Sequence, residues 1–273
     1  MSKLLVKPKA AENGCVIDIT PESAGWKYVG FALHRLPAGA AAAGEDAGRE
    51  ALLVLVTGAA KVTAAGKELG ELKSRDDIFS WGKPQCVYVP AGAAWRVEAT
   101  AATELAVCTA PGGPGREVMV VGPADIEDVT RGKGANTRHI HPLLMEEREG
   151  ADSLLVTEVI TPQGNWSSYP PHKHDTDDFP NETLLEETYY HRLNPPQGFG
   201  LHHIYTDDRS LDETVAFGDG DVTLVPRGYH PTAAPYGYEL YYLNVMAGPR
   251  RNWRFANDPD HDWIFQRDSK PES

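Results

Sequence analysis

The stretch Val222-Thr-Leu-Val-Pro-Arg-Gly-Tyr-His230 is the best guide to the architecture of this chain, because the core of it occurs twice. The upstream copy is Val87-Tyr-Val-Pro-Ala-Gly-Ala-Ala94, and the shared Val-Pro-x-Gly turns start at Val89 and Val225, which are 136 residues apart. Glu50 and Glu186 have the same offset, and each stands at the start of a strand-like run. Chance agreement is the competing explanation, since Pro-x-Gly turns are common. The matching offsets favour two copies of one β-domain.

Strand-like runs dominate the rest of the chain, and helical periodicity is scarce. Short apolar or alternating runs separated by turn residues are typical of an all-β sandwich or barrel. The expected strands are Leu52–Val56, Gln85–Val89, Glu104–Thr109, Glu117–Val121, Ser153–Ile160, Glu187–His191, Gly200–Thr206, Asp221–Val225 and Glu239–Val245. We expect an N-terminal domain over residues 1–120 and a C-terminal domain over 121–273, joined within Pro111–His141.

The composition excludes several classes of function. The chain has 273 residues, is 41% hydrophobic and carries a formal net charge of -13, which argues against binding to nucleic acid. No run approaches the roughly twenty apolar residues of a membrane span, and the first residues do not form a signal peptide. The three cysteines, Cys15, Cys86 and Cys108, are widely spaced, as expected for reduced thiols in a cytoplasmic protein.

The segment Tyr169-Pro-Pro-His172-Lys-His174-Asp175 carries the strongest chemical signal. Histidines at i and i+2 of an extended chain project from one face and can bind one ion. Glu187 begins a strand-like run, and His230 follows the Val-Pro-Arg-Gly turn. Three imidazoles and a carboxylate suit one divalent metal ion such as zinc, manganese, iron or nickel, with coordination positions left open. Glu186 is the rival to Glu187.

The N-terminal copy serves as a control for this metal site. Subtracting 136 from the four positions gives residues that do not ligate metals, namely Leu36, Ala38, Ala51 and Ala94. If both halves share a fold, the metal-binding residues are not needed to form it. The pattern therefore favours a functional site in the second half over a structural one.

The same residues carry a resemblance to the cupins, whose two motifs are matched by His172-x-His174 with Glu187 and by Gly220-x5-Pro226-x-Gly228-x-His230. Twelve residues separate His174 from Glu187, where the usual motif has three or four. The run Asn165-Trp-Ser-Ser-Tyr-Pro-Pro-His-Lys-His-Asp175 and the C-terminal Asn257-Asp-Pro-Asp-His-Asp-Trp263 resemble the 5-deoxy-glucuronate isomerases of inositol catabolism.

This resemblance implies a two-domain cupin (bicupin) of tandem jelly-roll β-barrels. It also implies a metal-dependent aldose–ketose isomerase that converts 5-deoxy-D-glucuronate to 5-dehydro-2-deoxy-D-gluconate. The uronate ketol-isomerases of pectin breakdown, acting on 5-dehydro-4-deoxy-D-glucuronate, are similar. An iron-dependent cupin oxygenase or a non-catalytic sugar-acid binder would also fit these residues, because one scaffold hosts many chemistries. The expected partner is a small sugar acid, and pairing of sheet edges in a homo-oligomer is possible.

An isomerase needs groups that move hydrogen and groups that hold the substrate. Alternation along the strand places Tyr189 and His191 on the face of Glu187, so His191 is the first candidate base and Tyr189 a donor to the developing oxyanion. A hydride shift would need no base. Arg192 and Arg227 are the candidate partners of the substrate carboxylate, since a guanidinium matches a carboxylate bidentately.

The remaining histidines and aromatics are weaker candidates. His139 and His141 form a second His-x-His, but no acid or third histidine follows them at a comparable spacing. His202 and His203 are adjacent on a strand, so only one of them can face a pocket. His261 is expected in a surface loop. Core packing is expected for the aromatic residues near the C-terminus, Trp253, Phe255 and Trp263.

Overall fold

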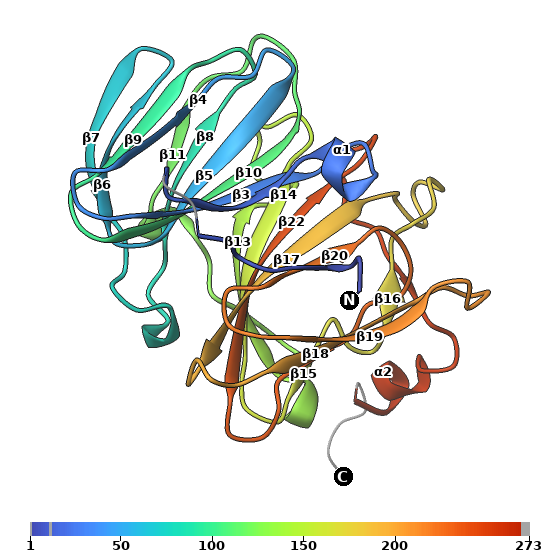
Figure 1. The fold of residues 1–273 in the computed structure, drawn as a ribbon. Coiled ribbons are helices and arrows are strands. Elements are labelled where there is room, and N and C mark those ends of the chain that lie inside the picture. The colour runs from blue at the N-terminus through green and yellow to red at the C-terminus, as the bar shows by residue number, and fades with distance from the viewer. Residues whose placement is uncertain (1, 11–12, 269–273) are drawn as a thin grey trace.

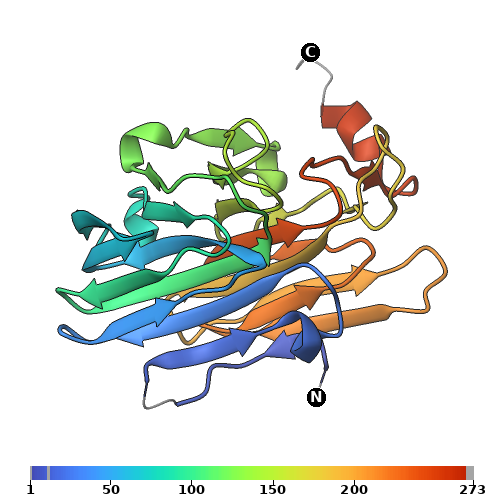
Figure 2. The same cartoon turned by 90° about the horizontal axis from the view of Figure 1, so that it is seen from above.

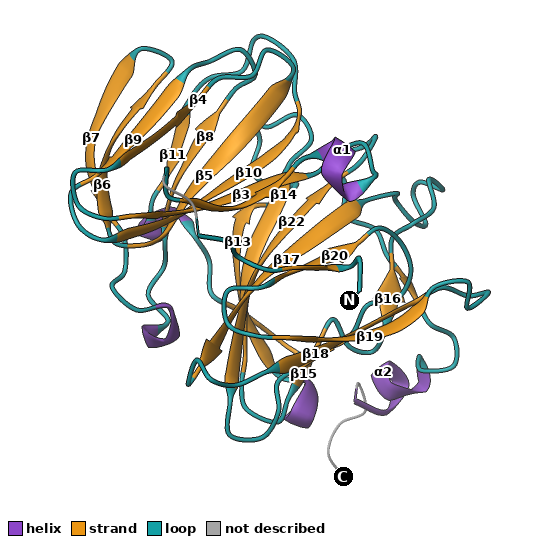
Figure 3. Cartoon of the chain, in the orientation of Figure 1, coloured by secondary structure: helices purple, strands orange, loops and turns teal. Residues whose placement is uncertain are grey.

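The computed structural model describes residues 2–10 and 13–268, and strands and their connections make up almost all of it (Figure 3). Its helices are short: α1 (Pro21–Ala24), α2 (Trp263–Asp268) and the 3-10 turns Ile78–Ser80, Pro123–Asp125 and Gly134–Asn136. No helix in these ranges is long and apolar enough to cross a membrane. The all-β prediction is confirmed.

Two sheets form the N-terminal half, at the upper left of Figure 1. The six-stranded sheet has the order β11 (Met119–Val121), β8 (Gln85–Val89), β5 (Arg49–Thr57), β10 (Thr103–Pro111), β3 (Gly30–Leu36) and β2 (Cys15–Ile19). The four-stranded sheet has the order β4 (Ala41–Gly44), β9 (Trp95–Ala99), β6 (Ala59–Ala64) and β7 (Lys67–Lys73). All the pairings are antiparallel, so short turns can join neighbouring strands.

The C-terminal half repeats this plan. Its seven-stranded sheet has the order β1 (Leu5–Val6), β20 (Val222–Val225), β17 (Glu186–Asn194), β22 (Glu239–Ala247), β14 (Leu155–Thr161), β13 (Arg138–Leu144) and β12 (Val129–Arg131). A four-stranded sheet faces it, with the order β15 (Trp166–Ser167), β21 (Thr232–Ala233), β18 (Gly200–Tyr205) and β19 (Asp212–Phe217). A two-stranded sheet joins β16 (His172–Lys173) to β23 (Ala256–Asn257). The N-terminal β1 thus pairs with a strand of the C-terminal half.

Alternation along the strands separates the main hydrophobic cores. On β5, Leu52 and Val54 face a central core, while Leu53 and Leu55 face the interior of the N-terminal barrel. On β17 and β22 the central core receives residues such as Tyr190 and Leu243, and the interior of the C-terminal barrel receives Tyr189 and Tyr242. Because side chains alternate with a period of two, each large sheet can be apolar on both faces.

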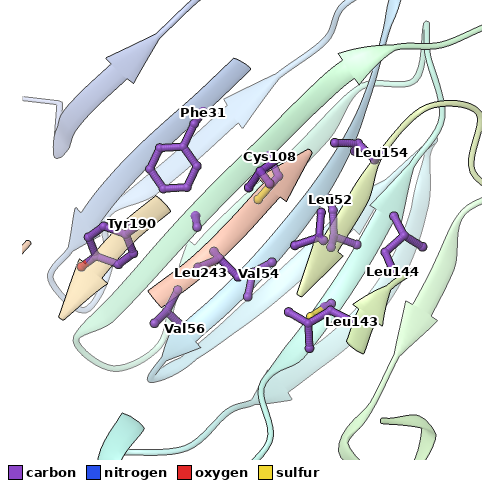
Figure 4. Packing of buried hydrophobic residues seen from close by; sticks show 14 of the residues in the cluster. Phe31, Leu52, Val54, Val56, Cys108, Leu143, Leu144, Leu154, Tyr190 and Leu243 are labelled. Carbon is purple, nitrogen blue, oxygen red and sulfur yellow. The ribbon is translucent and has the colours of Figure 1, made fainter. Parts of the chain in front are cut away.

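The central core joins the two halves face to face. It contains buried residues of the six-stranded sheet, among them Phe31, and of the seven-stranded sheet, among them Leu243 (Figure 4). Seen from above, the blue and green strands of the first half lie alongside the orange and red strands of the second (Figure 2). A barrel lies on the outer side of each large sheet, formed with the four-stranded sheet of the same half.

Two glutamates at matching positions of the repeat tie the halves together. The carboxylate of Glu50 accepts hydrogen bonds from the backbone amides of residues 152, 153 and 154, at 2.7, 2.7 and 2.6 Å. The carboxylate of Glu186 accepts from the amides of residues 27, 28 and 29, at 2.7, 2.6 and 3.1 Å. Each half therefore supplies a buried carboxylate to a loop of the other, an arrangement we call the reciprocal clasp.

Candidate metal centre

Pairing with the C-terminal segment places the first two histidines. His172 lies in β16, opposite Asn257 of β23. His174 lies two residues further on, and its carbonyl oxygen accepts a hydrogen bond of 2.9 Å from the amide of Leu185, just before β17. The long insertion between His174 and Glu187 therefore leaves the strand and returns to it within hydrogen-bonding distance.

A glycine turn places the third histidine. Gly228 has φ +88°, and a Cβ on it would lie 2.4 Å from the carbonyl oxygen of Tyr205. Glycine is needed there, because other residues rarely adopt this φ and no side-chain atom fits. The turn after β20 consequently directs His230 back into the barrel.

Strand alternation decides between the two glutamates. Glu186 faces the N-terminal half and is engaged in the reciprocal clasp. Glu187 has the opposite parity and faces the barrel interior, where its Oε2 lies 3.0 Å from His174 Nε2 and 3.1 Å from His230 Nε2. The geometry thus assigns Glu187, not Glu186, to the histidine cluster.

The four side chains form one buried group. One ring nitrogen from each of His172, His174 and His230 lies within 4.8 Å of the others. The His172 and His174 rings each lie 5.0 Å from the His230 ring. None of the three histidines is more than 8% exposed, and Glu187 is 2% exposed.

The donor atoms suit a metal ion. His174 Nδ1 lies 3.1 Å from the carbonyl oxygen of Leu185, and His230 Nδ1 lies 2.8 Å from that of Gly228. A carbonyl oxygen only accepts, so each Nδ1 carries the hydrogen and each neutral ring has its lone pair on Nε2. Both Nε2 atoms face the same carboxylate oxygen of Glu187, and His230 Nε2 has no hydrogen-bond partner in the described residues. Lone pairs that converge in this way repel one another unless a cation lies between them, so the residues fit a divalent ion.

The electrostatics of the cluster favour the ligating forms of two of its members. Burial by itself raises the pKa of Glu187, but the facing histidines outweigh it and hold this pKa well below its usual value. Burial, and then the neighbouring imidazoles, lower the pKa of His172 well below its usual value, and the charge of Arg138 adds to this effect. Glu187 is therefore ionised and His172 neutral, as metal ligands must be.

A chain of hydrogen bonds supports His230 from behind. His202 Nε2 donates to the carbonyl oxygen of His230 at 2.9 Å. His202 Nδ1 then accepts from the hydroxyl of Thr223 at 2.8 Å, and this hydroxyl accepts from His191 Nε2 at 2.9 Å. The chain holds the His230 backbone in place. On the other side of the cluster, the amide of Asn244 donates to Glu187 Oε1.

A cavity opens beside the cluster and has a volume of about 100 Å³. This volume is smaller than the ~300–1,000 Å³ usual for small-molecule sites, and the cavity is partly open to solvent. Alternate residues of β13, β14, β17 and β22 line it, and His172 and Glu187 reach it from the cluster. Met145 and Trp253 form part of its wall. The cavity therefore gives a small polar molecule access to the candidate metal position.

Two tyrosine–serine pairs line or adjoin this cavity. The Tyr189 hydroxyl lies 3.0 Å from Ser168 Oγ, and the Tyr242 hydroxyl lies 2.6 Å from Ser167 Oγ. Burial raises the pKa of Tyr189 well above its usual value, and it raises that of Tyr242 as well. Both hydroxyls consequently stay protonated and can donate hydrogen bonds.

The structure does not bring three of the expected residues to the cavity. His191 is fully buried, stacks on Phe217 with ring centroids 3.6 Å apart and bonds to Thr223, so its geometry does not support the role of base. Arg192 has the parity of Glu186 and pairs with Glu104 and Asp219, each at 2.8 Å, away from the metal ligands. Arg227 is exposed and donates to the hydroxyl of Ser210. We therefore withdraw His191, Arg192 and Arg227 as groups that contact the substrate.

The remaining candidates fall outside the cluster. His141 is buried between Glu158 and Asp128, with its ring 3.8 Å from that of Trp81, while His139 bonds to Thr130. His203 pairs with Asp212 at the surface. His261 lies in the turn before α2, and the nearby Trp263 is exposed. Phe255 packs on His172 with ring centroids 4.7 Å apart.

Of the pair His202 and His203, only His202 is buried beside the ligands, as alternation predicts, whereas sequence reasoning missed Asn244 and Arg138. His202 and Asn244 contact the ligands from neighbouring strands, and Arg138 lines the cavity from β13. No local motif marks Asn244 or Arg138. The one usable signal was parity: Asn244 and Tyr242 alternate with the central-core residues Leu243 and Val245 of β22.

Comparison with solved structures supports the fold. A crystal structure of an IolB-like protein from Salmonella typhimurium LT2 superposes with a TM-score of 0.93 at 47% identity, over 96% of this chain and 99% of that one. A variant of oxalate decarboxylase from Bacillus subtilis, a cupin, superposes with a TM-score of 0.63 at 13% identity, over 94% of this chain and 80% of that one. At this low identity the second likeness shows the fold alone, and the two-domain cupin prediction is confirmed.

Comparison of sequences identifies the family. A protein called 5-deoxy-glucuronate isomerase in Geobacillus kaustophilus is 49% identical over 267 residues, which are 97% of this chain and 96% of that protein. The protein of the same name in Bacillus subtilis strain 168 is 42% identical over 98% of this chain and its own full length. The model of the KduI/IolB family matches residues 4–264. The chain therefore belongs to the KduI/IolB family.

Proposed function

We propose that this protein is a metal-dependent aldose–ketose isomerase that converts 5-deoxy-D-glucuronate to 5-dehydro-2-deoxy-D-gluconate in inositol catabolism. One observation carries the proposal: the Nε2 atoms of His174 and His230 converge on Oε2 of Glu187 beside a cavity whose wall includes four hydroxyl side chains. The name of the full-length relatives supports the choice of substrate. Zinc, manganese and iron are the proposed ions, because imidazole and carboxylate ligands suit all three.

The three histidines and Glu187 would hold the ion. When bound, it would polarise the carbonyl of the substrate and acidify the neighbouring hydroxyl as a Lewis acid. The protein's own part is to hold Glu187 and His172 in their ligating forms and to orient all four side chains. Asn244 orients the Glu187 carboxylate, and the Nδ1 hydrogen bonds of His174 and His230 fix their ring tautomers.

Isomerisation moves two hydrogens, one between carbons and one between oxygens. The proton on oxygen 2 must reach oxygen 1, and the hydroxyls of Tyr189 and Ser168, 3.0 Å apart in the cavity wall, are placed to relay it. Within the described cavity lining, the only carboxylate and imidazole groups are those of Glu187 and His172. We therefore propose that the hydrogen on carbon 2 passes with its electron pair to carbon 1 without a protein base.

The deciding experiment is an anaerobic assay of metal-reconstituted protein with 5-deoxy-D-glucuronate in D₂O, followed by NMR. The expected result is a ketose that carries no deuterium from solvent on carbon 1. Deuterium at that position would refute the direct transfer but not the isomerase. Absence of ketose with zinc, manganese and iron in turn would refute the isomerase, and oxygen uptake by the iron form would instead indicate an oxygenase.

We also propose that only one of the two halves binds the metal ion. The N-terminal domain, residues 1–120, would lack a metal site, since Ala51 of β5 occupies the position that matches Glu187 and packs in the core of its barrel. The C-terminal domain, 121–273, would carry the chemistry. The three cysteines are free thiols, which supports a cytoplasmic location. Assembly into a homo-oligomer stays a prediction.

A further inference from the structure

The part of the cavity wall formed by β13 carries a positive charge that no predicted role explains. Arg138, at the start of β13, lines the same cavity as His172 and Glu187. Its side chain is half-buried, and its Nη1 donates to the carbonyl oxygens of Asn136 and Tyr169, each at 3.1 Å. These two bonds orient the guanidinium, and among residues 2–10 and 13–268 its other donors have no acceptor.

No carboxylate in the described residues forms an ion pair with Arg138. Burial lowers its pKa, and the like charge of Arg131 lowers it further. Arg131 lines the same cavity, with its guanidinium carbon 5.2 Å from the ring centroid of Trp253. Two arginines thus meet in one cavity, and the more buried one has no countercharge. A desolvated charge without a partner destabilises the protein, so an anionic ligand is the natural partner for it.

Arg138 shares its cavity with two of the candidate metal ligands. His172 and Glu187 line the same cavity, so one small molecule can reach both the ion and the guanidinium. A sugar acid that binds the ion through its carbonyl end can therefore present its carboxylate to the arginine wall. Arg192 and Arg227 have no such position, because one is neutralised by two acids and the other is exposed outside the cavity.

We propose that Arg138 binds the carboxylate of the substrate, with Arg131 as a second positive charge, and so makes the site specific for sugar acids over neutral sugars. This inference rests on the proposed function, because it takes the substrate to be a sugar acid. A guanidinium can bind the carboxylate bidentately, which fixes the orientation of the chain between the two anchored ends. Arg138 is accordingly a specificity-determining residue that acts on the end of the substrate remote from the reaction.

The test compares two sugars and three variants. The sugars are 5-deoxy-D-glucuronate and 5-deoxy-D-glucose, which has a hydroxymethyl group in place of the carboxylate. The variants are Arg138→Met, which removes the charge but keeps most of the length, Arg138→Lys, which keeps the charge, and Arg227→Met as the matched control outside the cavity. Binding of both sugars to the metal-loaded proteins is measured by calorimetry, and turnover by NMR.

Arg138→Met should weaken binding of the acid by roughly ten- to hundred-fold, the usual effect of losing hydrogen bonds to a charged group. Binding of the neutral sugar should change less than about three-fold, so the preference for the acid is lost. Arg138→Lys should recover part of it, and Arg227→Met should match the wild type. An unchanged preference in Arg138→Met, or an equal loss for both sugars, would overturn the proposal.

Metal content and thermal unfolding of each variant separate specificity from structure. Arg138 holds the carbonyl of Tyr169, three residues before His172, so a purely structural role would lower the bound metal. We expect an unchanged metal content, and a loss in both Arg138 variants would overturn the specificity role. The binding measurements also separate this inference from the proposed function: an acid preference that depends on Arg138 without turnover would refute the isomerase alone.

Discussion

Adjacent glutamates of β17 offer a sharp test of the architecture, because they have the same chemistry and opposite surroundings. Glu186 accepts three amide hydrogen bonds from the other half, and Glu187 faces the histidines. We predict that Glu186→Gln destabilises the metal-free protein and keeps its metal site. We predict that Glu187→Gln loses the metal site and leaves the stability of the metal-free protein almost unchanged.

The structure sets the magnitude for Glu186→Gln. A hydrogen bond to a charged group contributes ~1.5–3 kcal/mol, and a buried amide left without an acceptor costs ~1–3 kcal/mol. Lys27 and Tyr28 are partly exposed, so water can replace their bonds, but Val29 is fully buried. Glutamine also turns its side-chain NH₂ group, a donor, toward these backbone amides. We therefore expect the free energy of unfolding to fall by about 3 kcal/mol. At about 2 °C per kcal/mol for a chain of this size, the melting temperature should fall by about 6 °C.

Two measurements on each variant check this prediction. Unfolding is followed by circular dichroism on metal-free protein, because bound metal would itself raise the melting temperature. Metal content is then measured after reconstitution. Glu187→Gln should bind little metal while its metal-free form unfolds within about 1 kcal/mol of the wild type. If Glu186→Gln lost the metal and Glu187→Gln kept it, the strand parity on which the whole site depends would be wrong.

Three further predictions follow from other buried groups. The Arg75–Glu158 pair joins the halves at 2.5 Å with both side chains buried. Arg75→Leu and Glu158→Gln should therefore each lower the free energy of unfolding, measured in urea, by about 3–5 kcal/mol, and the double variant should recover part of this loss. Strictly additive losses would contradict the prediction. Burial holds the pKa of His191 well below its usual value, so the stability it contributes is complete above pH ~6.5 and falls with decreasing pH by up to ~1.4 kcal/mol per unit. His191→Phe should show a shallower slope between about pH 6.5 and 5, and an identical slope would count against a neutral His191. His174→Ala should lose metal and activity but keep its circular dichroism spectrum, whereas an unfolded variant would indicate a structural metal.

Much of the fold was predictable because the long strands have a clear sequence pattern. The runs that became β5 and β22 are largely apolar on both faces, as expected of strands buried between two layers. β17 is buried on both faces as well, although most of its residues are polar. Other strands gave no such signal. β6 (Ala59–Ala64) is rich in alanine, which has low intrinsic strand propensity, and it forms through burial against its neighbours. β16 and β23 have two residues each and exist only because they pair with one another.

The site, too, has a part that could be predicted from the sequence and a part that could not. Its ligand cluster follows from local spacing and strand parity, which already place Glu187 and Tyr189 on one face. Parity also argues against Arg192, which shares the face of Glu186 and points to the other half. Arg138 could not be predicted, because its role depends on β13 pairing with β14 in the sheet that lines the cavity, a neighbour relation that the sequence does not state.

The reciprocal clasp bears on how the chain is made. A ribosome delivers the first half before the second, and at that stage the amides of residues 27–29 have no carboxylate to bind, while Glu50 has none of its three amide donors. The sheet face that becomes the central core is then uncovered too. Exposed hydrophobic surface of this kind makes an incomplete chain prone to aggregate. The two halves therefore depend on each other for the burial of this face, and the second half must be present before the first is fully covered.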